Sequence, residues 1–267
     1  MRAVGGEKLM TMAEAVRRFV PDGATVAMGT CLEPAIPFAA GHEMIRQGRR
    51  DLTLVGPISD ALFDQLIGAG CVATIRAAWV GNVSEGLGHC YRRATELGQP
   101  RPVQVYDYSN FTISLALWAA AWDAPYLPTR TLLGSDIVRT NPELRVVDGA
   151  VRVPPLRPDV AVLHVQRADA WGRAHLWGPL GISEEAGLAA RRVILSCEEL
   201  VDPEVTLSDP NRISSRRPGW WRWCTSPEAA IPPRSRVGGG ATTPPTAPTP
   251  SARGPRRGSA PGWRSGC

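Results

Sequence analysis

A carboxylate lies among hydroxyl and amide side chains in the middle of the chain, at Asp107. Tyr106 and Tyr108 flank it, and Ser109 and Asn110 follow directly. A carboxylate with such hydrogen-bonding neighbours can act as a general base or can orient a substrate. The same residue types also favour turns, so a turn cap is the alternative role for Asp107. We predict a site at this cluster, with Asp107 as a catalytic candidate and Ser109 and Asn110 as substrate-binding candidates.

A second candidate group, Gly29 and Thr30, follows the apolar residues 24–28 and comes shortly before a helix that we expect to begin near Pro34. Free N–H groups at the start of a helix can receive a carboxylate or an oxyanion. An ordinary strand-to-helix turn is the alternative. Glu85 is a second catalytic candidate, with a loop position near the site as its alternative role. The remaining substrate-binding candidates, all at strand ends or turns, are Asn82, Gly134 and Ser135.

These candidates need a scaffold, and the hydrophobic pattern predicts an α/β fold. Short apolar runs alternate with amphipathic segments, which is typical of a mostly parallel sheet with helices on both faces. Such sheets place ligands at the carboxyl ends of their strands. The expected strands are 24–28, 52–55, 72–80, 103–105, 125–130, 160–166 and 193–196. The expected helices are 11–19, 35–47, 63–67, 111–122 and 184–190.

The length of 267 residues suits one large α/β domain. No apolar run approaches the ~18 residues of a membrane span, and the first residues lack a signal-peptide core, so we expect a cytoplasmic protein. Six scattered cysteines form no CxxC pair, which indicates buried thiols. No histidine pair has metal-ligand spacing, and no GxGxxG follows a strand, so neither a metal site nor a dinucleotide site is expected.

The composition changes near Ile213, so we divide the chain into a body, residues 1–213, and a tail, residues 214–267. The tail holds nine arginines and one acidic residue, Glu228, and therefore carries +8. Because the whole chain carries +5, the body sums to −3, and the basic pI gives no reason to expect a nucleic-acid partner. The Arg-, Pro- and Gly-rich composition of the tail predicts disorder.

The tail also suggests a frameshift near residue 214. Lys8 is the only lysine, against 29 arginines, which indicates GC-rich coding DNA. When the tail is back-translated and read from the third base of each codon, one frame encodes an apolar, strand-like segment followed by Gly-Gly-His-Pro. Our hypothesis is that only the body retains the original reading frame, and the coding DNA would test it.

Several segments of the body together resemble the A (alpha) chain of family I coenzyme A transferases, of the glutaconate CoA-transferase kind. They occur in the order and spacing of that family, across about residues 10–213. The segments are AMGTCLEPAIPFAA, RQGRRDLTLVG, QLIGAGCV, VYDYSNF, PYLPTRTLLGSD, RPDVAVLHVQRADAWGRAHLWG and CEELV.

The resemblance implies the CoA-transferase α/β fold and the transfer of CoA between carboxylic acids. A glutamate attacks an acyl-CoA thioester in this family, giving an anhydride and then a glutamyl-CoA thioester. In glutaconate-type enzymes the glutamate lies on a separate B (beta) subunit, which would be the partner of this chain. A CoA thioester is then a substrate, and no permanently bound cofactor is implied. The family often has a second glycine where this chain has Thr30, and a basic residue before the proline, where it has Glu33.

Two alternatives remain at this point. Ring-opening CoA-thioester hydrolases of the same family use an A-subunit glutamate as base, and counting back from APYLP (124–128) puts Asp107 at that place. Aspartate is one methylene shorter, which weakens the hydrolase interpretation. A non-catalytic sugar-phosphate-sensing module on a related isomerase-like fold is the second alternative, and the absence of a helix-turn-helix domain from the sequence counts against it.

Overall fold

The computed structural model describes residues 8–30, 35–59, 61–82, 85–210 and 225–226. The expectation of a disordered tail therefore falls almost wholly outside the described residues. The exception is strand β12 (Thr225–Ser226), which pairs in parallel with β11 (Arg192–Leu200) at Leu195 and Ser196.

The centre of the fold is a mostly parallel sheet, and the predicted fold class is confirmed. The described strands run in the order β12-β11-β9-β1-β2-β3-β4, with β5 also on β3 and β10 also on β9. Within this described sheet, only the pairs β3–β4 and β9–β10 are antiparallel. The remaining strand bounds are β1 Thr25–Ala27, β2 Leu52–Ser59, β3 Val72–Asn82, β4 Gly86–Leu87, β5 Gln104–Asp107, β9 Val160–Ala168 and β10 Ala174–His175.

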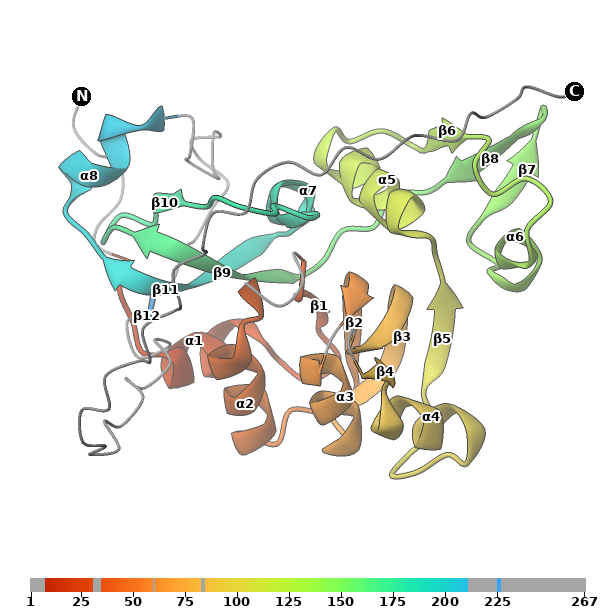
Figure 1. Cartoon of the computed structure of the whole chain (residues 1–267), viewed down its shortest axis with the longest axis horizontal. Coiled ribbons are helices and arrows are strands. Elements are labelled where there is room, and N and C mark those ends of the chain that lie inside the picture. Colours follow the sequence, from red (N-terminus) through yellow and green to blue (C-terminus); the bar gives the residue numbers. More distant parts are fainter. Residues whose placement is uncertain (1–7, 31–34, 60, 83–84, 211–224, 227–267) are drawn as a thin grey trace, which may run out of the picture. The chain divides into compact units, whose positions relative to one another are not determined.

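Helices cover both faces of this sheet (Figure 1). Side chains alternate between the faces, as β9 shows: Val160 and Val162 belong to one core, and Ala161, Leu163 and Val165 belong to the other. Four helices pack on the first face, α1 Met12–Phe19, α2 Phe38–Arg46, α3 Ala61–Gly68 and α4 His89–Glu96. The described helices α5 Asn110–Ala121 and α7 Ser183–Ala189 contribute buried residues to the core on the second face.

Local sequence signals start two of these helices. Thr11 caps α1, because its hydroxyl accepts a hydrogen bond from the N–H of Glu14 at 3.2 Å. Ser109 caps α5 in a reciprocal capping box with Thr112. The apolar run after Ser109 is therefore a helix, as the sequence predicts, and it begins at the carboxyl end of β5.

A small antiparallel sheet follows α5, and here the sequence prediction is wrong. The pattern of residues 125–130 predicts a further strand of the α/β sheet, but β6 (Leu127–Thr129) pairs with β8 (Ala150–Val153), which also pairs with β7 (Arg145–Val147). The short helix α6 (Asp136–Thr140) lies between β6 and β7. The prediction that this segment forms a strand is confirmed, but the strand pairs with residues more than twenty positions later in the chain instead of with the parallel sheet.

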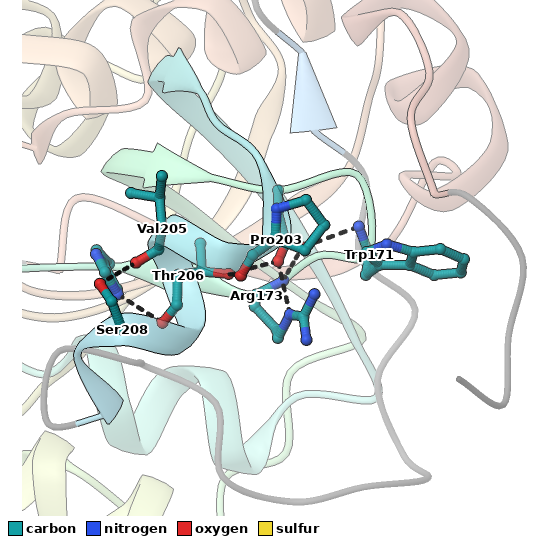
Figure 2. Close-up of polar contacts among 8 residues, drawn as sticks. Trp171, Arg173, Pro203, Val205, Thr206 and Ser208 are labelled. Carbon is teal, nitrogen blue, oxygen red and sulfur yellow. Dashed lines mark hydrogen bonds and ion pairs between the residues drawn. The ribbon is translucent and has the colours of Figure 1, made fainter. Parts of the chain in front are cut away.

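The last described helix, α8 (Pro203–Ser208), is fixed to the turn between β9 and β10 by one buried carboxylate, Asp169. The hydroxyl of Thr206 and the Nε of Arg173 each donate to Asp169 Oδ2 at 2.6 Å, and Figure 2 shows both side chains among these polar contacts. The backbone N–H groups of Trp171 and Arg173 donate to the other oxygen. Four donors compensate the buried charge of Asp169, and the hydrogen bond from Thr206 attaches α8 to the turn between β9 and β10.

Candidate functional site

The strand order of the sheet reverses at β1. From β1 the chain continues to β2 and β3 on one side of the sheet, and later to β9 and β11 on the other side. Ligands of open α/β sheets bind at the carboxyl ends of the strands where the order reverses in this way. Gly29 and Thr30 follow β1 directly, so both predicted residues lie at this switch point.

The side chain of Thr30 points into the protein. It is 3% exposed, and its Oγ1 lies 2.7 Å from the Oγ of Ser183 at the start of α7. The carbonyl of Thr30 also accepts a hydrogen bond from the N–H of Ile182 at 2.8 Å. Thr30 therefore joins the loop after β1 to the start of α7. Gly29 has φ 62°, a left-handed conformation that favours glycine.

A cavity of about 460 Å³ lies at the carboxyl ends of β2, β3 and β5. Most of its wall is apolar, and its polar groups come from the start of α5. Ser109 and Asn110, two of the predicted residues, therefore lie together in one cavity. The lining residues are Ile58, Ala78, Trp79, Tyr108, Ser109, Asn110 and Ile137. An apolar cavity with a few polar groups at one end suits an acyl chain that carries a polar terminus.

The catalytic candidates do not line this cavity. Asp107 is the exposed last residue of β5. Burial of Tyr91 on α4 raises the pKa of its hydroxyl, and the negative charge of Asp107 is the second cause of this rise. Tyr106 packs against the α5 core and Tyr108 belongs to it, so the alternation of side chains along β5 directs Asp107 to the opposite, α4 side of the sheet. Glu85 is exposed in the turn between β3 and β4. None of the described residues that line the cavity is acidic.

The other candidates lie around the same edge of the sheet. Asn82 ends β3 and pairs with Gly86 of β4. Gly134 is exposed with φ 81°, and Ser135 begins α6 while its hydroxyl donates to the carbonyl of Leu132 at 2.8 Å. These two residues hold α6 in place, and α6 supplies Ile137 to the cavity wall. Their roles as substrate contacts stay predictions.

A charged network that the sequence did not predict adjoins the cavity at Tyr108. The buried Tyr108 donates its hydroxyl to Glu143 at 2.5 Å, and Arg76 Nη1 lies 2.5 Å from both oxygens of Glu143. Arg76 also stacks on the ring of Tyr106, 4.7 Å from its centroid. Burial and the Glu143 carboxylate raise the pKa of Tyr108, so the phenol stays protonated and donates. The network joins β3, β5 and the segment after α6.

Asn141 adds two further hydrogen bonds to this junction. Its side-chain amide donates to the carbonyl of Asp107 at 2.9 Å, and its oxygen accepts from the N–H of Glu143 at 3.0 Å. Asn141 is 1% exposed. The segment between α6 and β7 is thus fastened to the end of β5, which fixes one wall of the cavity.

The comparisons with known proteins decide the family. The family model for coenzyme A transferase matches residues 9–215 of this chain. The chain belongs to the coenzyme A transferase family. It is 41% identical over 201 residues to the A chain of the 3-oxoadipate CoA-transferase from Pseudomonas knackmussii, which covers 73% of this chain and 71% of that protein. It is 28% identical over 227 residues to the A chain of the glutaconate CoA-transferase from Acidaminococcus fermentans, covering 77% and 70%.

Solved structures agree with this assignment. The glutaconate coenzyme A-transferase of Acidaminococcus fermentans superposes with a TM-score of 0.75 at 26% identity, over 84% of this chain and 77% of that chain. A variant of the decarboxylase AibA/AibB gives a TM-score of 0.67 at 26% identity, over 85% and 86%. The predicted family, the A-subunit type and the role as one component of a CoA-transferase are confirmed.

Membrane spans and metal clusters are both missing from the part of the chain that the structure describes. No helix in the described ranges has both the length and the apolar character that crossing a bilayer requires. Within the same ranges, His, Cys, Asp and Glu side chains form no group of three or more that could hold a metal ion.

The network beneath the cavity leads to a stability and binding prediction for this CoA-transferase component. Replacing Glu143 with Ala leaves the Tyr108 hydroxyl buried without its acceptor and Arg76 without its ion pair. We expect a loss of about 2 kcal/mol in the free energy of unfolding, measured with urea. The KM for the acyl substrate should rise more than kcat falls, because Tyr108 lines the cavity but is not a reacting group.

Two variants control this experiment. Glu143→Gln keeps an acceptor for Tyr108 and should recover part of the lost stability and most of the lost substrate affinity. Glu96→Ala removes an exposed i,i+4 partner of Arg92 and should change little. Equal effects of Glu143→Ala and Glu96→Ala would show that the network does not support the cavity.

Proposed function

We propose that this chain is the A subunit of a two-subunit CoA-transferase that moves CoA from an acyl-CoA to a short dicarboxylic acid. Both named relatives support the class of acid, because 3-oxoadipate and glutaconate are dicarboxylic acids. The cavity of about 460 Å³ supports an acyl-binding role. Its apolar wall would contact the carbon chain, and Ser109 and Asn110 would hydrogen-bond to the distal carboxylate.

The observation that carries the need for a partner is the absence of acidic side chains from the described lining of that cavity. Transfer through a covalent intermediate requires a carboxylate nucleophile next to the thioester. In the proposed enzyme a B subunit supplies this carboxylate, and this chain binds the acyl group. Gly29 and Thr30, which follow β1, would offer their backbone N–H groups to the thioester oxygen. CoA enters as a substrate, this chemistry needs no permanent cofactor, and we place the enzyme in the cytoplasm.

Reconstitution with a CoA-transferase B subunit tests this proposal. The purified chain alone should show no CoA transfer between an acyl-CoA and 3-oxoadipate or glutaconate. Adding the B subunit should produce transfer, measured by chromatography of the CoA esters. Replacing Ile137 with Trp should raise KM for the acid, while Arg139→Gln, on the same helix but exposed, should leave KM unchanged. Transfer by the chain alone, lost on Glu85→Gln, would contradict the proposal and make Glu85 the nucleophile.

Substitution of Asp107 separates the remaining roles of that residue. Asp107→Asn keeps the size of the side chain and removes its charge. Because Asp107 lies outside the described cavity lining, we expect kcat and KM of the reconstituted enzyme to change less than about threefold, with a small change in melting temperature. A drop in kcat of ~10²-fold or more would instead identify Asp107 as a general base and favour the hydrolase interpretation. A rise in KM with constant kcat would make it a substrate contact.

A further inference from the structure

A second cavity, of about 320 Å³, lies at the opposite edge of the sheet, by the amino ends of β2, β3 and β5. The turn before β2 contributes Arg49 and Arg50, the turn before β3 contributes Gly70, and the turn before β5 contributes Arg101. The lining, as far as the structure describes it, contains three arginines and no acidic residue, and we call this the arginine cavity. It consists of Ile45, Gly48, Arg49, Arg50, Ala69, Gly70, Cys71, Pro100 and Arg101.

Nearby acids compensate this positive charge only in part. Asp51 pairs with Arg101 at 2.8 Å, but its side chain is 59% exposed. Asp22 accepts a hydrogen bond from the backbone N–H of Arg50 at 2.9 Å. Like charges around one small cavity repel each other, and the repulsion is stronger where water is partly excluded. The cluster is therefore stabilised by any anion that enters the cavity.

Arg49 provides the second observation. Its Nη2 donates to Gln47 at 2.8 Å, but its Nε is buried and has no hydrogen-bond acceptor among the described residues. A buried donor without an acceptor is costly, and in native proteins such a group usually has a ligand, an ion or a water as its partner. The buried Nε shows that the hydrogen bonding of the Arg49 guanidinium is incomplete, and Arg49 is one of the residues that line this cavity.

We infer that this arginine cavity binds a phosphate-type anion. The planar guanidinium group presents donors in a fork that matches phosphate oxygens, which favours phosphate over chloride. The volume lies at the low end of the range of about 300–1,000 Å³ typical of small-molecule sites. The eight residues of β2 separate this cavity by roughly 25 Å from the cavity at the carboxyl ends of β2, β3 and β5, so the two sites are distinct.

Calorimetry and thermal unfolding of the full chain test this site, with inorganic phosphate as the probe and sodium chloride of equal ionic strength as the reference. Phosphate should raise the melting temperature beyond the chloride reference, because a ligand that binds only the folded state stabilises it. Arg49→Gln and Arg101→Gln should each weaken phosphate binding at least about tenfold. Arg139→Gln removes an exposed arginine on α6 and should bind phosphate like the unchanged chain.

A second arm, with AMP in place of phosphate, distinguishes the source of the phosphate group. AMP binding at least about tenfold tighter than phosphate, and lost in Arg49→Gln, would identify a nucleotide; equal binding would identify the free anion. If Arg49→Gln does not fold, Arg101→Gln decides, because its side chain is already 36% exposed. Phosphate that acts no better than chloride, or binds equally to the unchanged chain and both variants, would overturn the inference.

Discussion

The central parallel sheet is stable only if both of its faces are covered, and the rest of the structure follows from this requirement. In the buried parts of β9 and β11, residues 160–163 and 193–195, successive side chains enter opposite cores. Each crossover must therefore return over one face as a helix. The chain uses one face for the helices up to α4 and the other for α5 and α7. This change of face separates β1 from β9 in sequence and makes the strand order reverse at β1, the position where such sheets bind ligands.

The cavity at the carboxyl ends of β2, β3 and β5 depends on a contact between distant parts of the chain. Arg76 and Glu143 are 67 positions apart, and Tyr108 lies between them in the sequence. Their ion pair and the Tyr108 hydrogen bond hold the segment after α6 against the end of β5. The helix α6 before this segment supplies Ile137 to the wall of the cavity. The family assignment gives the cavity a chemical setting, and the proposed partner gives it the nucleophile that its described lining lacks.

Local patterns were enough to predict the longer parallel strands of the main sheet, but not the short strands β4, β10 and β12. The apolar runs of β1, β2, β3, β9 and β11 follow from neighbouring residues, as does the helical run that becomes α5. The small sheet was not predictable, because β6 and β8 are more than twenty positions apart and no local pattern identifies them as partners. Glu143 was missed for the same reason, since nothing near it in sequence marks it as the partner of Arg76. Ser109 and Asn110 could be placed beside a cavity because they follow a predicted strand end, and their role in substrate binding stays a prediction.

The central claim is that this chain binds the acyl group while another chain carries the nucleophile. Intact-mass spectrometry of the reconstituted enzyme, quenched during turnover with an acyl-CoA, tests this directly. The account predicts an unchanged mass for this chain, with the covalent CoA adduct on the B subunit. An adduct on this chain, mapped by proteolysis to Glu85 or Asp107, would contradict the account.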